Sequence, residues 1–177
     1  ECSFCYSTQN VNAAQPELSL DEIRRIWQEA KKLGAFSSVI SGGEPTLRKD
    51  LVEVLEAVEA KDHIVCMTTN AIALTEAKLE KLKNAGLGTV HFSLDSIDAK
   101  ENDKLRGYEG HFDQVERCIK WAKSFGLNVA ISTVAGRNDK GKIDQMIAFC
   151  KERKIALVLS LASAMGEWAG QLEHNVT

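Results

Sequence analysis

The sequence has no excess of positive charge and no long apolar segment, and each absence excludes a class of protein. Its 22 lysine and arginine residues are outnumbered by 25 aspartate and glutamate residues, so it lacks the basic surface that a nucleic-acid backbone attracts. No uncharged apolar run approaches the ~18 residues of a transmembrane helix, and the first residues do not resemble a signal peptide. We therefore predict a cytoplasmic protein that binds neither nucleic acid nor membrane.

The sequence also lacks the cysteine pattern of a disulfide framework. Its five cysteines, an odd number, stand in a chain of 177 residues that is long enough to bury a core without covalent cross-links. Three of them, Cys66, Cys118 and Cys150, lie in apolar or helical patterns, where burial as small residues is expected. Only Cys2 and Cys5 are closely spaced. With 44% apolar and 27% charged residues, the chain has the composition of one globular domain.

Helical periodicity alternates with short apolar runs along the whole chain. The first predicted helix is marked at both ends, by a capping box of Ser19 and Glu22 and by Gly34. Helices are expected over residues 19–33, 50–60, 75–84, 111–125 and 142–153, and strands over 36–41, 63–68, 89–94, 128–134 and 155–161, with a polar stretch over 95–110. This alternation predicts an α/β domain with a parallel sheet. Periodicity alone does not distinguish an open doubly wound sheet from a barrel.

The loop Ser41-Gly-Gly-Glu-Pro45 follows the first predicted strand. Gly42 and Gly43 allow a backbone to approach a ligand closely, and the carboxylate of Glu44 accepts hydrogen bonds from a cation. The loop therefore suits an ammonium group and not a phosphate, which the carboxylate would repel. A plain glycine-rich turn before the next helix is the alternative interpretation.

Polar residues also end the next two strands. Thr69 and Asn70 suit either hydrogen bonds to a sugar or a cap and turn before the following helix. Ser93 and Asp95 alternate at the end of the third strand and so are expected to point the same way, unless they form an Asx turn. Because the carboxyl ends of parallel strands share one edge, all these motifs should converge on one cavity.

The pair Cys2-Ser-Phe-Cys5 has several interpretations when taken alone: a redox dithiol, half of a zinc site, two ligands of an iron-sulfur cluster, or surface thiols. A thioredoxin-type dithiol would begin a helix, yet the next predicted helix begins only at Ser19. Zinc would need two more ligands, and the four histidines show no paired spacing.

Taken together, these motifs resemble those of the radical S-adenosylmethionine (radical SAM) enzymes. Cys2-Ser-Phe-Cys5 resembles the last two cysteines of the family's CxxxCxxC motif, including the aromatic Phe4. Ser41-Gly-Gly-Glu-Pro45 matches its GGEP loop, and Thr68-Thr-Asn70 is similar to its TN(G) ribose segment, although Ala71 stands where glycine is usual. The stretch from Phe92 through Ser96, Arg106-Gly107 and Phe112-Asp113 is similar to the branch of the molybdenum-cofactor protein A and the peptide-modifying maturases.

The resemblance implies a fold. Radical SAM cores are partial (β/α)6 TIM-type barrels, and the five predicted strands would be their second to sixth. The first strand and the first cluster cysteine would lie upstream of Glu1. We therefore expect residues 1–177 to be a radical SAM core domain within a longer protein, and expect this chain by itself not to cleave SAM.

The resemblance also implies a chemistry. Cys2 and Cys5, with the upstream cysteine, would hold a 4Fe-4S cluster whose open iron chelates the amino and carboxylate groups of SAM. One electron then cleaves SAM to methionine and a 5′-deoxyadenosyl radical, which abstracts hydrogen from a substrate. The other residues expected near the cofactors are Phe4 beside the cluster; Gly42, Gly43 and Glu44 at the methionine amino group; Thr69 and Asn70 at the ribose; Ser93, with Asp95, at the methionine carboxylate or ribose; and, more weakly, Ser132 and Met165, the latter being ordinary core otherwise.

The substrate stays open at this level, a small molecule or a peptide or protein, and the electron donor would be a flavodoxin or ferredoxin. No residue is assigned a catalytic role. The alternative is a non-catalytic barrel that binds SAM or a partner and carries a vestigial cluster site. A third interpretation is an ordinary barrel enzyme that acts on an amine through Glu44.

Overall fold

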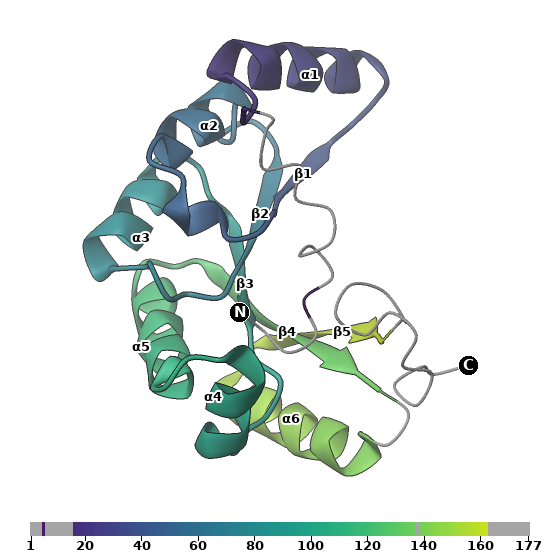
Figure 1. Ribbon diagram of the computed structural model, residues 1–177. Coiled ribbons are helices and arrows are strands. Elements are labelled where there is room, and N and C mark those ends of the chain that lie inside the picture. Colours follow the sequence, from purple (N-terminus) through teal and green to yellow (C-terminus); the bar gives the residue numbers. More distant parts are fainter. Residues whose placement is uncertain (1–4, 6–15, 137–138, 163–177) are drawn as a thin grey trace.

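The computed structural model describes residues 5, 16–136 and 139–162 (Figure 1). Its strands form one parallel sheet in the order β1-β2-β3-β4-β5, so each strand pairs with its neighbours along the chain. A doubly wound sheet reverses its order part-way, and this one does not. The expected partial barrel is therefore confirmed. The strands are β1 (Ser37–Ile40), β2 (Ile64–Thr69), β3 (Thr89–Ser93), β4 (Asn128–Ala135) and β5 (Ala156–Leu161).

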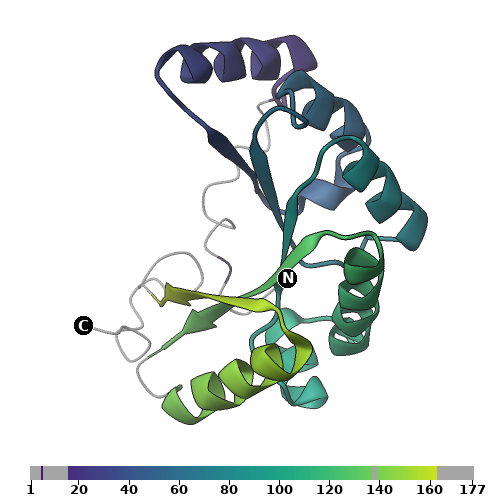
Figure 2. The same ribbon diagram turned by 180° about the vertical axis from the view of Figure 1, so that it is seen from behind.

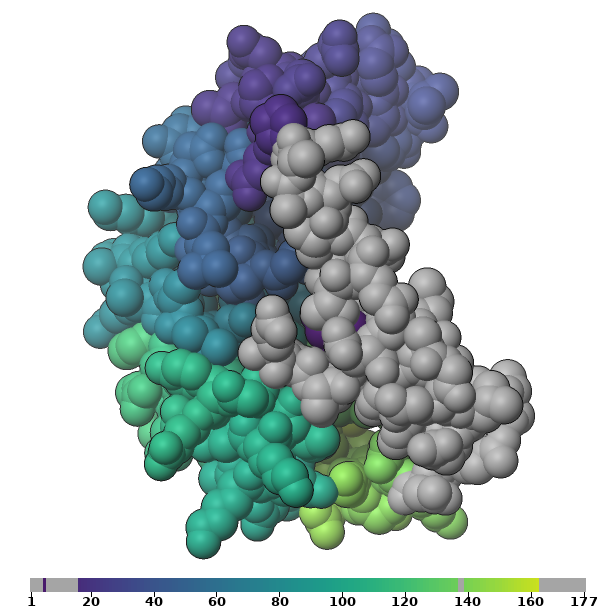
Figure 3. Space-filling view, viewed as in Figure 1, coloured from purple at the N-terminus to yellow at the C-terminus, as the bar shows by residue number. Residues whose placement is uncertain are grey.

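The helices lie on the outer face of the curved sheet, as the two opposite views show (Figures 1 and 2). In the space-filling view, the described residues form a crescent with α1 at one end and α6 with β5 at the other (Figure 3). The predicted capping box at Ser19 is present. The helices are α1 (Leu20–Lys32), α2 (Leu51–Ala57), α3 (Glu76–Asn84), α4 (Ala99–Arg106), α5 (His111–Ser124) and α6 (Lys140–Arg153), with a 3-10 turn η1 (Pro45–Leu47).

Helix α4 lies inside the stretch 95–110, for which the sequence predicted only a polar connection. The helix is capped by Asp98, which accepts a hydrogen bond from the Glu101 amide at 2.8 Å. Asn102 is the residue that this helix buries, so there is no apolar stripe for a periodicity search to find. Asp103 then accepts hydrogen bonds from the amides of Gly110 and Phe112, at 2.6 and 2.9 Å, and so completes the start of α5.

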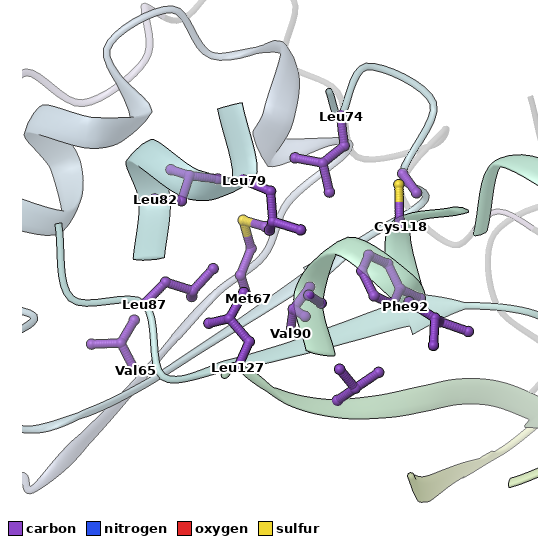
Figure 4. Packing of buried hydrophobic residues seen from close by; sticks show 14 of the residues in the cluster. Val65, Met67, Leu74, Leu79, Leu82, Leu87, Val90, Phe92, Cys118 and Leu127 are labelled. Atoms are coloured by element: carbon purple, nitrogen blue, oxygen red, sulfur yellow. The ribbon is translucent and has the colours of Figure 1, made fainter. Parts of the chain in front are cut away.

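The core lies between the outer face of the sheet and the helices (Figure 4). Alternate residues of β2 and β3, such as Met67 and Phe92, pack there against side chains of α3 and α5, among them Leu79 and Cys118. Burial raises the pKa of Cys118 to about 12 and that of Cys150 to about 11, as suits the predicted role of both thiols as core residues.

Cys66 is the exception among the three, because it is only half-buried. Its neighbours along β2, Val65 and Met67, are buried in the core, so strand alternation places Cys66 on the opposite, inner face. The expectation that Cys66 would be buried was therefore wrong. An apolar run does not reveal which of its residues faces the inside of the barrel.

The inner face of the sheet carries polar side chains between apolar ones such as Val39 and Val158, which pair in register with Cys66 and Ser132. Register places Thr68 beside His91, and Ser93 beside Ser132. Burial lowers the pKa of His91 below its ordinary value, so this side chain is neutral at pH 7. A ligand that lies against the inner face would thus meet neutral hydrogen-bonding groups.

No helix of the described residues is both long and apolar enough to span a membrane.

Candidate functional site

The carboxylate of Glu44 joins the loop after β1 to the end of β2. Glu44 is half-buried and is the N-cap of η1. Its Oε1 accepts hydrogen bonds from the amide and the hydroxyl of Thr46, at 3.0 and 2.5 Å, and from the Thr69 hydroxyl at 2.6 Å. Its Oε2 accepts from the Asn70 amide at 2.7 Å. These donors are neutral hydroxyl and amide groups, so they orient the carboxylate without neutralising it.

The two glycines before Glu44 are not explained by protein packing. Among the described residues, no atom beyond the glycine itself and its two chain neighbours lies within 4 Å of the position that a Cβ would take at Gly42 or Gly43. Both residues are exposed on the loop that leaves β1. A backbone without side chains here leaves the approach to Glu44 open to a ligand.

Thr69, Asn70 and Ala71 form a turn, so the turn interpretation of this segment is correct. The Thr69 hydroxyl accepts a hydrogen bond from the Ala71 amide at 2.9 Å, and the Asn70 side chain accepts one from the Ile72 amide at 3.0 Å. The turn does not exclude a binding role, because the same turn presents Thr69 and the Asn70 amide to Glu44.

Ala71 has a left-handed backbone, with φ of 63°. This conformation costs an L-residue with a side chain about 1 to 2 kcal/mol, and glycine adopts it freely. The unusual alanine in the TN segment therefore introduces a strain at the edge of the site.

Lys78 on α3 contributes to the same loop, and sequence reasoning did not single it out. Its ammonium group donates a hydrogen bond to the Thr46 carbonyl. Thr46 is buried, and its amide in turn donates to Glu44. Lys78 thus supports the loop through the backbone. The sequence gives no signal for this contact, which spans 32 positions along the chain.

Asp95 belongs to a second, buried cluster. It forms an ion pair with Arg106, and the two side chains are only 5% and 9% exposed. Its Oδ1 also accepts hydrogen bonds from the Val134 amide at 3.0 Å and the Thr133 hydroxyl at 3.2 Å. Asp95 therefore ties the end of β3 to β4 and α4.

Ser93 and Asp95 consequently have different surroundings, although the sequence predicted that they point the same way. β3 ends at Ser93, so the alternation of its side chains does not extend to Asp95. Ser93 is half-buried beside Ser132, its register partner on the inner face. Ser93 and Ser132 lie where a ligand inside the barrel could reach them.

Two further buried polar residues support this second cluster. The Asn102 carboxamide accepts a hydrogen bond from the Asp95 amide at 3.2 Å, and its nitrogen lies 2.9 Å from Nδ1 of His111. Burial, and then the charge of Arg106, lower the pKa of His111, while the Asn70 carbonyl and Asp103 act in the opposite direction. A search for ligand motifs misses Asn102 and His111 because their partners come from other elements.

Several predicted cofactor residues lie outside the described residues, namely Cys2, Phe4 and Met165. Cys5 is described and is half-buried. Within the described ranges, no group of three or more His, Cys, Asp or Glu side chains could hold a metal ion. The assignment of Cys2 and Cys5 to a cluster therefore stays a prediction from the resemblance to the family's motif.

The profile of the radical SAM superfamily matches residues 1–150. The chain belongs to this superfamily. It is 30% identical over 146 residues to the PqqA peptide cyclase of Rhizobium meliloti (strain 1021), an alignment that covers 82% of this chain and 39% of that protein. The chain thus spans well under half the length of this relative.

Solved structures agree with the fold of this radical SAM domain. Streptococcus suis SuiB bound to the precursor peptide SuiA matches with a TM-score of 0.77 and 27% identity, over 100% of this chain and 39% of that one. SuiB bound to S-adenosylmethionine matches with a TM-score of 0.72 and 29% identity, over 92% and 36% of the two chains. Methylornithine synthase, at 20% identity and a TM-score of 0.76, shares the fold, covering 91% of this chain and 49% of its own.

Proposed function

We propose that this chain is the core of a radical SAM enzyme, which binds S-adenosylmethionine where the strands end and a 4Fe-4S cluster beside it. When bound, these groups supply reductive cleavage of SAM to a 5′-deoxyadenosyl radical for hydrogen abstraction from a substrate. The observation that carries this proposal is Glu44, a carboxylate held in place by neutral donors beside an open glycine loop.

The residues at this edge suit the chemistry of SAM. The Glu44 carboxylate can receive the methionine ammonium group, which Gly42 and Gly43 allow to approach. Asn70, Ser93 and Ser132 supply neutral polar groups for the ribose and the methionine carboxylate. Asp95 is already paired with Arg106, so its role is to position β3 and β4 and not to contact the cofactor.

The cluster ligands in this proposal are Cys2 and Cys5, together with a cysteine upstream of this chain. Their spacing of two residues suits adjacent thiolates on one iron-sulfur cluster. Phe4 and Met165 stay candidate neighbours of the cluster and of SAM on the resemblance alone. We also propose a cytoplasmic location and a flavodoxin or ferredoxin as the electron donor.

We further propose a peptide substrate. The PqqA peptide cyclase and SuiB bound to its precursor peptide are similar to this chain at 30% and 27% identity. The inner face, with Thr68, His91 and Ser132, offers neutral hydrogen-bonding groups that suit the amides of a peptide. Production of a cross-linked or otherwise modified peptide would distinguish this substrate from a small molecule.

The decisive experiment uses the full-length protein, reconstituted anaerobically with iron and sulfide. After addition of dithionite and SAM, chromatography should detect 5′-deoxyadenosine. Cys2→Ala and Cys5→Ala should each abolish the product and lower the iron content. Cys66→Ala is the matched control for the iron content, because Cys66 is also a half-buried thiol, and it should retain the iron. Full iron content in the double Cys2→Ala/Cys5→Ala variant would show that the ligand assignment is wrong.

A further inference from the structure

Gln114, on α5, holds the turn after β2 from outside the site. Its Nε2 donates hydrogen bonds to two backbone carbonyls of the turn, that of Ala71 at 3.0 Å and that of Leu74 at 2.8 Å. These partners lie 43 and 40 positions away along the chain. The side chain is half-buried, so the contacts are partly protected from water.

The orientation of this carboxamide is determined by its partners. Both turn contacts are carbonyl oxygens, which only accept, so the nitrogen must face them. On its other side, Oε1 accepts a hydrogen bond from Nη2 of Arg117 at 2.7 Å. Gln114 is therefore held in one orientation by groups at both ends of its amide.

The turn requires such support because of Ala71. Its left-handed backbone, φ 63°, is unfavourable for a residue with a Cβ, and the side chain is fully buried. Asn70 is joined to the far side of Ala71, because its side chain accepts from the Ile72 amide at 3.0 Å, and its own amide donates to Glu44 at 2.7 Å. The geometry of the turn and the position of the Glu44 carboxylate are thus linked.

We propose that Gln114 is a positioning residue for the SAM site: it holds the turn 70–74 in the left-handed conformation that Ala71 by itself disfavours. By this contact it keeps the Asn70 amide and the Thr69 hydroxyl on Glu44. The effect on SAM binding rests on the proposed function. The effect on the turn does not.

The test is a double-mutant cycle of Gln114→Met and Ala71→Gly in the full-length, cluster-loaded protein. Methionine keeps the volume of glutamine and removes both donors. Gln114→Met should raise the calorimetric Kd for SAM by roughly five-fold or more, because a smaller fraction of molecules then has the competent turn. Ala71→Gly in the same protein should recover most of this loss, because glycine adopts the left-handed backbone freely.

The loss of the buried Ala71 methyl group is common to both backgrounds and cancels in the cycle. Lys120→Met, at an exposed position of the same helix, is the control and should leave the Kd unchanged. An equal loss with alanine and with glycine at position 71 would overturn the proposal, as would an unchanged Kd in Gln114→Met. Should Gln114→Met not fold, Gln114→Asn, whose shorter side chain cannot reach both carbonyls, replaces it in the same cycle.

A second measurement separates this inference from the proposed function. Hydrogen exchange of the Asn70 and Ile72 amides reports the turn without any SAM, and Gln114→Met should accelerate it, with recovery by Ala71→Gly. If the wild-type protein does not bind SAM but the exchange cycle shows this coupling, the proposed function fails and the support of the turn stands. If SAM binds and exchange is unchanged by Gln114→Met, the inference fails.

Discussion

Glu44, after β1, and Asp95, after β3, are both carboxylates where strands of one sheet end, and they differ in counter-charge. Asp95 is buried and paired with the guanidinium of Arg106. Glu44 is half-buried and accepts its hydrogen bonds from the amides of Thr46 and Asn70 and from the hydroxyls of Thr46 and Thr69. A carboxylate already paired with a cation is part of the scaffold, whereas one oriented by neutral donors can attract a cationic ligand.

The same difference separates the two halves of the site in their expected response to mutation. The Asp95 cluster connects β3, β4 and α4, and its carboxylate is already paired with Arg106. Removing one of these side chains should therefore affect folding. The Glu44 cluster connects two loops, so its loss should affect binding first. The following predictions test this separation, beginning with the largest expected effect.

Arg106→Met leaves the buried Asp95 carboxylate without its cation and should lower the free energy of unfolding by about 3 to 5 kcal/mol. Urea denaturation measures this loss. The double variant Asp95→Asn/Arg106→Met should recover part of it, because no charge is then left unpaired. The control is Arg24→Met, which removes the exposed pair with Asp21, 54% and 93% exposed, and should cost less than about 1 kcal/mol. Equal losses for both arginines would contradict the role given to the Asp95 cluster.

Glu44→Gln should weaken SAM binding by about 1.5 to 3 kcal/mol, roughly ten- to a hundredfold, because a charge-assisted hydrogen bond becomes a neutral one. Calorimetry on the cluster-loaded, full-length protein measures this change, and Glu53→Gln, at an exposed position of α2, is the control. Asp95→Asn should instead affect mainly the urea midpoint. If both variants fold and Asp95→Asn reduces the affinity for SAM as much as Glu44→Gln, the proposed difference between the two carboxylates is wrong.

Stability should decrease below about pH 6.5 because of His111. Burial is the main cause of the lowered pKa of this buried histidine, whose ordinary value is 6.5. The unfolded chain therefore takes up a proton at a higher pH than the folded one. The stabilisation is fully present above pH 6.5 and decreases as the pH falls toward the folded pKa, by at most about 1.4 kcal/mol per pH unit.

Urea denaturation between pH 7.5 and 5 measures this slope, and His111→Gln should reduce it. His91→Gln is the matched variant, because burial also lowers the pKa of the half-buried His91. It should remove a smaller part of the slope. An unchanged slope in His111→Gln would contradict the assignment.

Ser93→Ala should have the smallest effect, a loss of about 0.5 to 1.5 kcal/mol in SAM binding, because a neutral hydroxyl makes a weaker hydrogen bond than a carboxylate. The same calorimetric assay detects it, and folding should be unaffected because the side chain is half-buried on the inner face. Ser132→Ala tests the neighbouring strand at the same register. If Ser93→Ala weakens SAM binding more than Glu44→Gln does, the charge of Glu44 is not the main contribution to SAM binding at this edge of the sheet.

Much of the fold could be predicted because its signals are local. The capping box at Ser19, the glycine stop at Gly34 and the apolar runs of the strands are read within one element, and the structure confirms them. α4 was missed because it buries Asn102 and not an apolar stripe. Cys66 was misplaced because alternation does not state which face of a strand meets the helices.

The sequence by itself determined the order of helices and strands, the glycine loop before Glu44 and the motifs of the radical SAM superfamily. These depend on residues a few positions apart, whose spacing persists in any fold. Only the tertiary structure decided the partners of the carboxylates, because these partners are distant in the sequence. Glu44 accepts a hydrogen bond from Thr69, which is 25 positions away along the chain, and Asp95 accepts one from Thr133, at a separation of 38 positions. The support of Ala71 by Gln114, 43 positions away, is of the same kind. Such contacts exist only once the sheet has brought the ends of its strands to one edge and α5 has packed beside them.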